Sequence, residues 1–373
     1  MSQIENQPLL QPYQKGALHL NNRLVMAPMT RSRSNNPENV PNELNAEYYA
    51  QRASAGLIIS EGTPVSPQGV GYINIPGIYS AAQVEGWKTV TSAVHSKGGK
   101  IYAQLWHVGR MSHPDFHNGE LPVAPSAINP NDQAFTAEGF KPTVTPRALE
   151  VEEIKGIVED FRNAAANAVK AGFDGVEIHS SNGYLFHQFF NRCSNQRTDA
   201  YGGTIENRAR LLFEVLDAVK EVIDLSRVGV RLNPSMHEQF GITVDEETAP
   251  TFEYIVKRLN DYNLAYLHLT EASPKVAELP YAIKEVAKHF RPLYHGTLII
   301  NGGFTQETGN KVLEDGLADL VAYGRPFIAN PDLVERFAEN AELNAPDYNT
   351  FYSNTGAVGY TDYPTLAQTV EAR

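Results

Sequence analysis

Short apolar runs alternate along the chain with longer stretches in which apolar residues recur every three or four positions. Eight runs are rich in Val, Ile and Leu and lack strict polar alternation, which is typical of strands buried on both faces of a parallel sheet. These runs are "RLVMAPM" (23–29), "GLIISEG" (56–62), "KIYAQLWH" (100–107), "GVEIHSS" (175–181), "VGVRLNP" (228–234), "AYLHLTE" (265–271), "TLIINGG" (297–303) and "DLVAYGRPF" (319–327). The pattern predicts eight buried strands.

Helical periodicity fills the gaps between these runs, most clearly at residues 150–170. Glu150, Glu152 and Glu153 stand near its start, where the helix dipole favours acidic side chains, and Gly172 follows its end. Its apolar positions form one stripe: Ile154, Ile157, Val158, Phe161, Ala164, Ala165, Ala168 and Val169. Similar stretches predict helices at 204–224, 246–260, 280–290, 305–315 and 331–340.

Eight βα units in one chain predict an α/β fold, a single (β/α)8 TIM barrel that spans about residues 23–340. An open doubly wound sheet is the alternative, but no G-x-G-x-x-G follows the first strand. Residues 9–22 predict a β-hairpin at the bottom of the barrel. Residues 108–148, rich in Pro, Asn and His, predict a long functional loop after the third strand. Residues 341–373 form a C-terminal segment, and we expect one domain over residues 1–373.

Composition narrows the class of protein. Apolar residues make up 42% and charged residues 20% of the 373 positions, ordinary values for a globular enzyme. The net charge of -12 argues against nucleic-acid binding, which needs a basic surface. A single cysteine excludes an intrachain disulfide. We find neither a secretory signal nor an uninterrupted run of 18 apolar residues, so a cytoplasmic location without membrane contact is expected.

The polar residues at the strand ends carry the chemistry, because barrel enzymes build their sites at the C-terminal ends of the strands. The seventh and eighth runs end in Gly302, Gly303, Gly324 and Arg325. Bare backbone amides beside a guanidinium favour a phosphate, although each glycine loop alone is explained by a tight turn. Gln104 and Arg231 would project into the same mouth, where they suit the polar edge of a planar ring. Phosphate and ring together indicate flavin mononucleotide (FMN).

Other functions were weighed against this one. His107, His179 and His268 lack the carboxylates that a metal hydrolase needs, and His268 in mid-strand suits a core position. Glu61 and Glu271 stand where the paired carboxylates of a hydrolase would. That alternative leaves the phosphate loops and the Arg on the fifth run without a role. A barrel that keeps FMN only as a structural or sensing ligand is a third hypothesis.

Six blocks of sequence, in order, resemble the Old Yellow Enzyme family of FMN-dependent ene-reductases. The blocks are "APMTRSR" (27–33), "AQLWHVGR" (103–110), "HSSNGYLFHQFF" (179–190), "SNQRTDAYGGTIENRAR" (194–210), "YGRPFIANPDL" (323–333) and "GYTDYP" (359–364). The family includes bacterial N-ethylmaleimide and pentaerythritol tetranitrate reductases and plant oxophytodienoate reductases. The resemblance covers residues from about 9 to about 366. It implies non-covalent FMN, reduced by NADPH or NADH, and a small activated alkene as substrate, with no protein partner.

The resemblance also implies roles for individual residues. FMN would be bound by Pro28, Met29, Thr30, Gly62, Gln104, Arg231, Gly303, Gly324 and Arg325. The substrate cavity would be bordered by Tyr72, Trp106 and Tyr352. His179 and Asn182 would hold the substrate's carbonyl or nitro oxygen, and Tyr184 would be the catalytic proton donor. Members carry either His/His or His/Asn at the 179 and 182 positions, and this chain is of the His/Asn type.

These residue types suit the reduction of an activated double bond. A hydride from reduced flavin N5 to the β-carbon makes negative charge grow on the carbonyl oxygen, and two placed donors stabilise it. A phenol stays protonated at neutral pH and can still protonate the α-carbon. On residue pattern alone, Tyr184 is equally well explained as a packing aromatic beside Phe186, Phe189 and Phe190. His187 and Gln188 are expected to be structural, and Cys193 has no catalytic partner.

Overall fold

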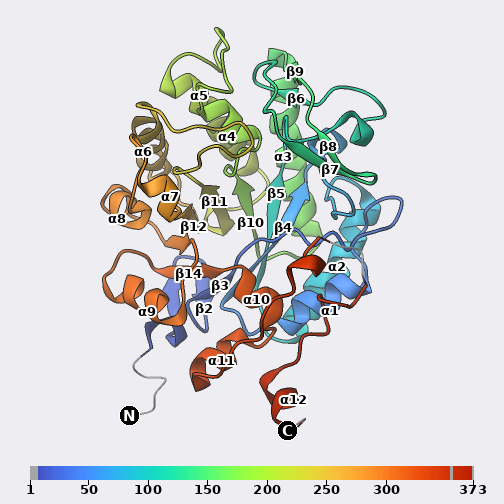
Figure 1. The fold of residues 1–373 in the computed structure, drawn as a ribbon, viewed down its shortest axis with the longest axis vertical. Helices are drawn as coiled ribbons and strands as arrows, with labels where there is room; N and C mark the ends of the chain where they lie inside the picture. The colour runs from blue at the N-terminus through green and yellow to red at the C-terminus, as the bar shows by residue number, and fades with distance from the viewer. Residues whose placement is uncertain (1–6, 353–355, 372–373) are drawn as a thin grey trace.

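A closed barrel of parallel strands forms the centre of the computed structural model, which describes residues 7–352 and 356–371. Figure 1 shows these strands at the middle of the molecule with helices around them. The barrel strands, in the order in which they pair, are β3 (Leu24–Met26), β4 (Leu57–Pro64), β5 (Ile101–Trp106), β10 (Gly175–His179), β11 (Val228–Leu232), β12 (Tyr266–Thr270), β13 (Leu298–Asn301) and β14 (Leu320–Tyr323), and β14 closes onto β3. The predicted (β/α)8 barrel is confirmed, and each predicted run coincides with one of its strands, although β4 continues to Pro64, beyond the predicted end at 62.

Helices cover the outside of the barrel because their apolar stripes pack on the strands. They are α1 (Glu43–Gln51), α2 (Ala81–Ser96), α3 (Val151–Lys170), α4 (Leu185–Phe190), α5 (Ile205–Val219), α6 (Thr248–Leu259), α7 (Pro274–Ala277), α8 (Val286–Phe290), α9 (Gln306–Glu314), α10 (Arg325–Ala329), α11 (Leu333–Glu339) and α12 (Leu366–Glu371). Short 3-10 turns lie at Pro8–Leu10, Pro67–Gly69, Pro114–Phe116, Leu225–Arg227, Arg291–Leu293 and Tyr348–Thr350. No helix in the described ranges is long and apolar enough to cross a membrane.

Helix α3 shows how local sequence sets these elements. Glu150 caps its start, and the Glu153 carboxylate accepts the Glu150 amide at 2.8 Å, which completes a capping box. Gly172 follows the helix with φ +86, a conformation that favours glycine. Most of the predicted stripe is buried, but Val158 is only half-buried and Val169 is exposed, so the buried face is narrower than predicted.

The helix predicted at 280–290 is wrong in its first half. The structure has the short α7 earlier and begins α8 only at Val286. The break lies at Tyr281, whose positive φ of 66 is incompatible with a right-handed helix. Pro280 does not account for it, because proline is tolerated at the first position of a helix.

A hairpin closes the N-terminal end of the barrel. Strands β1 (Tyr13–Lys15) and β2 (Leu18–Leu20) pair antiparallel inside the predicted 9–22 segment. Tyr13, Leu18 and Leu20 pack with residues from the starts of the barrel strands, such as Leu57 and Tyr266. Tyr13 also shares a hydrogen bond of 2.8 Å with Thr297. The opposite end, where the strands finish, is left for the site.

The segment between β5 and α3 is more ordered than the loop predicted at 108–148. It contains β6 (Val123–Ala124) paired with β9 (Arg147–Ala148), and a hairpin of β7 (Gln133–Thr136) and β8 (Gly139–Pro142). Phe135 and Phe140 face each other across this hairpin with ring centroids 4.9 Å apart. The hairpin lies at the end of the barrel where the strands finish, and both rings line the cavity there.

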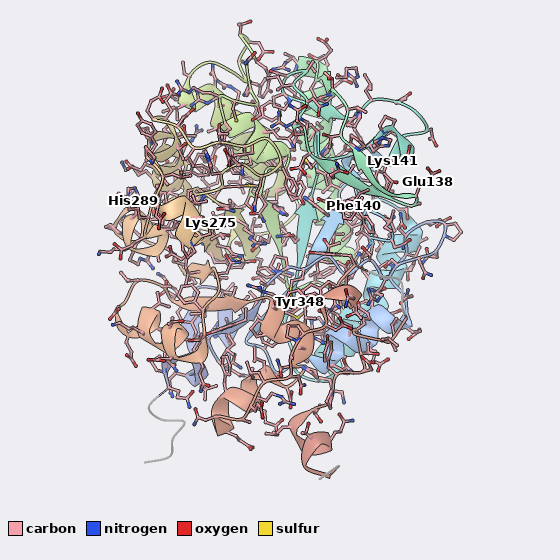
Figure 2. All side chains as sticks on the ribbon, in the orientation of Figure 1. Glu138, Phe140, Lys141, Lys275, His289 and Tyr348 are labelled. Atoms are coloured by element: carbon pink, nitrogen blue, oxygen red, sulfur yellow. The ribbon has the colours of Figure 1, made fainter. Side chains whose placement is uncertain are left out.

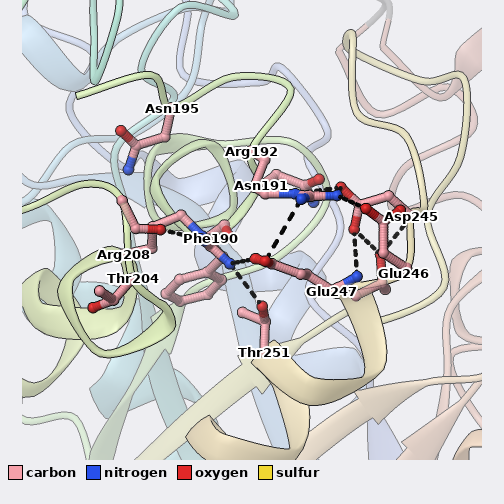
Figure 3. Close-up of polar contacts among 12 residues, drawn as sticks. Phe190, Asn191, Arg192, Asn195, Thr204, Arg208, Asp245, Glu246, Glu247 and Thr251 are labelled. Atoms are coloured by element: carbon pink, nitrogen blue, oxygen red, sulfur yellow. Dashed lines mark hydrogen bonds and ion pairs between the residues drawn. The ribbon is translucent and has the colours of Figure 1, made fainter. Parts of the chain in front are cut away.

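A network of charges joins the α4–α5 region to the start of α6 (Figure 3). The buried Arg208 guanidinium donates to the Phe190 carbonyl at 2.8 Å, to Glu247 at 2.7 Å and to Thr251 at 3.1 Å. Arg192, which is more exposed, pairs with Asp245 and Glu246 on the same loop. These contacts fix the loop after β11, the strand that carries Arg231.

Candidate active site

A cavity of about 1310 Å³ opens at the carboxyl ends of the barrel strands. Typical ligand pockets have about 300–1,000 Å³, so this one has room for more than one small molecule. Predicted site residues supply much of its lining: Pro28, Met29, Thr30, Tyr72, Tyr184, Arg231, Gly303, Gly324, Arg325 and Tyr352. Figure 2 labels two exposed aromatic residues at its mouth, Phe140 from the hairpin and Tyr348 from the C-terminal segment.

The remaining predicted residues do not line the cavity themselves. They are Gly62, Gln104, Trp106, His179 and Asn182. Trp106 and His179 pack against Tyr184, which does line it. The β4 register shifts between Ile59 and Gly62, which places Gly62 opposite Gln104. A side chain at Gly62 would meet the Trp106 ring at 2.4 Å. The glycine therefore lets this indole pack against the strand.

Four aromatic rings form one cluster beside the cavity. Trp106 stacks on His179, with centroids 5.8 Å apart and planes at 10°, and on Tyr72 at 5.4 Å and 21°. Tyr184 meets Trp106 edge-on at 4.8 Å and His179 at 5.2 Å. Stacked and edge-to-face contacts of this kind restrict ring motion. The predicted donor His179 and the predicted acid Tyr184 are thus held side by side.

Burial keeps both of these groups neutral. The pKa of His179 is held well below its usual range, first by burial and then by the nearby Arg231 and His268 charges. The pKa of Tyr184 is raised well above its usual range by burial and by Tyr72. The Tyr184 and Tyr72 oxygens are 2.9 Å apart, and burial raises the pKa of Tyr72 to about 12. At neutral pH the cluster therefore offers hydrogen-bond donors without charge.

His179 and Asn182 each keep one nitrogen for a ligand. The His179 Nδ1 atom faces Ser181, whose hydroxyl lies at 3.3 Å. Asn182 Oδ1 accepts a hydrogen bond of 2.8 Å from Asn233. Within the described ranges neither His179 Nε2 nor Asn182 Nδ2 has a hydrogen-bond partner, and neither is among the fully buried polar atoms. Neither nitrogen is therefore committed to another described group or completely enclosed.

A buried carboxylate organises the residues predicted to hold the polar edge of the ring. Glu177 on β10 stands opposite Gln104 in the β10–β5 register and accepts its amide at 2.7 Å. Its other oxygen lies 2.9 Å from His268 Nδ1. Burial alone would raise the pKa of Glu177, but His268, Arg231 and Gln104 together hold it below its usual value. The charge of Arg231 is therefore balanced from within the barrel.

Arg231 keeps unused donors at the cavity. Its Nε atom is buried and has no hydrogen-bond partner in the described chain. Its Nη2 lies 3.1 Å from the Asn301 amide oxygen when that amide is oriented to satisfy its neighbours. A buried unpaired guanidinium nitrogen is costly, so a ligand acceptor at this position is expected. A flavin ring with oxygens and nitrogens along one edge fits this requirement.

The loops after β13 and β14 supply a cradle for an anion. Gly303 has φ +83, and a side chain there would enter open space. Gly324 contacts only Met29, whose sulfur would lie 3.4 Å from an added Cβ. Neither glycine amide donates in a turn, loop or cap of the described ranges. Arg325 is exposed beside them and makes one long contact, 3.4 Å, with the Tyr348 hydroxyl. These groups fit a phosphate.

The carboxylates on which the hydrolase alternative depends make other contacts. Glu61 accepts hydrogen bonds from the Arg31 amide and the Tyr49 hydroxyl, and Glu271 caps α8 by accepting the Val286 and Ala287 amides. Neither carboxylate lines the cavity. No group of three or more metal-binding side chains occurs in the part of the chain that the structure describes.

The residues expected to be structural have structural contacts. His187 Nδ1 accepts the Gly183 amide at 3.1 Å. Gln188 donates to the carbonyls of Val108 and Gly183, which ties the loop after β10 to the start of the segment after β5. Cys193 is half-buried and contacts the Gly241 carbonyl.

The sequence assigned no role to three residues that contact the predicted site residues: Glu177, Asn233 and Asn301. A charged residue between Val176 and Ile178 was one available signal, because a buried carboxylate requires partners. For the two asparagines no such signal exists, since an Asn after a strand is equally typical of a turn.

Comparison with known proteins gives the family. The model of the NADH:flavin oxidoreductase / NADH oxidase family matches residues 8–344. The chain is 46% identical to 12-oxophytodienoate reductase 1 of Oryza sativa subsp. japonica, over 97% of this chain and 94% of that protein. A structure of morphinone reductase is 48% identical, with a TM-score of 0.90 over 99% of both chains. The old yellow enzyme homologue from Zymomonas mobilis is 44% identical, with a TM-score of 0.90 over 96% of this chain and 99% of that one. The chain therefore belongs to the Old Yellow Enzyme family, within the NADH:flavin oxidoreductase / NADH oxidase family, and is an FMN-dependent oxidoreductase of the ene-reductase type.

Proposed function

We propose that this protein reduces carbon–carbon double bonds conjugated to a carbonyl or nitro group, with NADPH or NADH as the source of electrons. The observation that carries this proposal is the pairing of neutral donors with a neutral phenol beside one cavity. His179 and Tyr184 pack edge to face at 5.2 Å, and Asn182 lies between them in sequence. The single cysteine is in keeping with action in the cytoplasm.

The cofactor would be held at both ends. The Gly303 and Gly324 amides and Arg325 would bind its phosphate, and Gln104 and Arg231 would bind the polar edge of its ring. Its remaining contacts would come from the start of the barrel and from β4: Pro28, Met29, Thr30 and Gly62. The chemistry that FMN supplies when bound is hydride transfer, from a reduced nicotinamide to the β-carbon of the alkene.

The protein's own residues act on the substrate oxygen and on the α-carbon. As the β-carbon gains a hydride, negative charge grows on the conjugated oxygen. Hydrogen bonds from His179 Nε2 and Asn182 Nδ2 would stabilise that charge more than they stabilise the bound substrate. Tyr184 would then give its proton to the α-carbon and recover one from water. The net reaction consumes one NAD(P)H and one proton for each double bond reduced.

Tyr72, Trp106 and Tyr352 would shape the space for the alkene. Trp106 holds the His179 and Tyr72 rings by stacking, so it sets the wall without a polar contact of its own. Tyr352 lines the cavity from the C-terminal segment and is 55% exposed. Substrates of different size would therefore be distinguished more by Tyr352 than by the packed rings.

The test separates the two halves of the cycle. FMN-loaded protein is reduced anaerobically with NADPH or NADH and then mixed with cyclohex-2-enone, and the visible flavin absorbance is followed in each step. We expect Tyr184→Phe to slow oxidation by the enone and to leave reduction by NAD(P)H nearly unchanged. Tyr281→Phe, which removes an exposed phenol outside the cavity lining, is the matched control. Wild-type protein whose reduced flavin is not reoxidised by enones or nitroalkenes would disprove the proposal.

A further inference from the structure

The two ends of the Asn182 side chain have opposite chemistry. Its nitrogen donates hydrogen bonds, whereas its oxygen only accepts them. A growing negative charge on a substrate oxygen would be stabilised by the first and repelled by the second. Asn182 itself has φ +53, a left-handed conformation that Asn tolerates, in the tight turn between Ser181 and Tyr184. The backbone therefore positions the amide but does not decide which end faces the ligand.

Asn233 makes that decision through one hydrogen bond. It follows directly after β11, whose register places Arg231 opposite His179 on β10. Asn233 Nδ2 donates to Asn182 Oδ1 at 2.8 Å. This contact occupies the accepting end of Asn182 and leaves Nδ2 without a partner in the described ranges. A hydrogen bond accepted by the amide oxygen also polarises the amide and strengthens its N–H groups as donors.

The reverse arrangement of the two amides is disfavoured by what it would bury. In the observed arrangement Asn233 Oδ1 is buried without a partner. If both amides were turned over, Asn233 Nδ2 would take that buried place and become an unpaired donor. Unpaired buried N–H groups are rarer in proteins than under-satisfied carbonyl oxygens. The observed arrangement is therefore the less costly one, and it presents a donor to the substrate.

We propose that Asn233 is a positioning residue that sets Asn182 as a hydrogen-bond donor toward the substrate oxygen. This inference rests on the proposed function. It adds that the preference for oxygen-bearing acceptors depends on a residue that follows the neighbouring strand and does not line the cavity. It also explains how an amide can serve beside an imidazole: a neutral group that could face either way is held in the donating orientation.

Two substitutions change the orientation in different ways. Asn233→Leu removes the contact and leaves the Asn182 amide free to turn, so at least half of the molecules lose the donor if the two orientations are equal in energy. Asn233→Asp keeps the shape but can only accept, so it would bind Asn182 Nδ2 and turn Oδ1 toward the substrate. Loss of one oxyanion donor commonly costs about 10²–10³ in rate. We expect about a 2- to 10-fold slower reoxidation by cyclohex-2-enone for Asn233→Leu and about 100-fold for Asn233→Asp.

The control is the same pair of substitutions in an Asn182→Ala background, because a residue that acts through Asn182 has no effect once that side chain is gone. This background also contains the charge of the new Asp, so it separates charge from orientation. Melting temperature and FMN content verify that each variant is folded and loaded. Loss of activity that persists undiminished in the Asn182→Ala background would overturn the inference, as would wild-type rates in both single variants.

A binding measurement distinguishes this inference from the proposed function. Cyclohexanone is a neutral carbonyl acceptor that cannot be reduced at a double bond, and its Kd is measured by ligand-observed NMR. We expect Asn233→Asp to weaken its binding relative to wild type, and not to do so in the Asn182→Ala background. If the wild type fails to reduce enones but this difference in Kd is found, the proposed function fails and the positioning role stands. Equal Kd values in wild type and Asn233→Asp would overturn the positioning role, whatever the activity.

Discussion

Replacing Tyr72 by Phe tests whether the acid Tyr184 depends on its neighbour. The two phenol oxygens are 2.9 Å apart, and Tyr72 also stacks on Trp106 at 5.4 Å. Phe keeps the ring and its packing, so the substitution removes only the hydroxyl. Before the reaction the contact joins two neutral phenols. Once Tyr184 has given up its proton, Tyr72 can donate to the phenolate oxygen, and the contact becomes charge-assisted.

The size of the expected effect on the rate follows from this change from a neutral to a charge-assisted hydrogen bond. A hydrogen bond to a charged group contributes about 1.5–3 kcal/mol, compared with about 0.5–1.5 kcal/mol for a neutral one. If the proton is half transferred in the transition state, about half of the difference between the charged and the neutral value is felt there. That is about 0.5–0.75 kcal/mol, or a rate lower by about 2- to 4-fold, since 1.36 kcal/mol corresponds to a factor of ten.

Anaerobic stopped-flow measures this effect directly. Reduced wild-type and Tyr72→Phe proteins are mixed with cyclohex-2-enone in H2O and in D2O. We expect slower oxidation and a larger solvent isotope effect in the variant, while reduction by NAD(P)H changes little. Tyr281→Phe is the matched control, because it removes an exposed phenol outside the cavity lining. An unchanged rate, or an equal loss when Tyr184 is already Phe, would refute the reasoning.

Three further predictions concern buried charges. Glu177→Gln should lower the free energy of unfolding by about 3–5 kcal/mol, the usual cost of breaking a buried ion pair. It should also raise the midpoint potential of bound FMN, because Arg231 loses its counter-charge. A urea titration measures the first effect and a redox titration the second, and unchanged values would contradict the proposed charge balance. Arg208→Met should lower the free energy of unfolding by about 3 kcal/mol, because buried carbonyls lose their donor. Arg192→Met, at a more exposed position, should lower it by less than about 1 kcal/mol. Urea titration measures both values, and equal losses would contradict this ranking. Burial raises the pKa of Glu61 to about 7, so the folded state binds a proton that the unfolded chain releases near pH 4, and stability should fall by about 3 kcal/mol as the pH rises from about 4 to 7. Glu61→Gln should lack this fall, and parallel pH profiles for wild type and variant would show the assignment to be wrong.

The fold was predictable because its signals are local. Each barrel strand is a short run of Val, Ile and Leu, and the α3 stripe and its capping acids are visible in one stretch of sequence. The prediction failed where the backbone of one residue departs from its neighbours, as at Tyr281, whose positive φ of 66 interrupts the helix expected at 280–290. It also missed the β7–β8 hairpin. Its strands have four residues each, and β8 has no fully buried residue, with Phe140 71% exposed, so the hydrophobic signal is weak.

The site was predictable in its residue types but not in its partnerships. Polar side chains at the ends of buried strands are conspicuous, so the donors and the cradle glycines could be named one by one. Which residue touches which depends on strand register, for example Glu177 opposite Gln104 and His179 opposite Arg231. Register is set by packing around the whole barrel and cannot be derived from any single strand. The hydrogen bond between Asn233 and Asn182 belongs to this second kind of information.

The charges around the cavity favour stabilisation of the developing negative charge by neutral hydrogen-bond donors instead of by charged side chains. Glu177 balances Arg231 inside the barrel, and burial together with the Arg231 charge keeps His179 neutral. A cationic donor in this place would attract any anion in the resting state and would gain less when the substrate becomes charged. Neutral donors held by packing and hydrogen bonds interact weakly with a neutral carbonyl and strongly with a developing enolate. In the proposed reaction two residues outside the cavity lining would therefore affect the rate. Glu177 would keep the field of Arg231 from dominating the cavity, and Asn233 would keep a dipole pointed at the substrate oxygen.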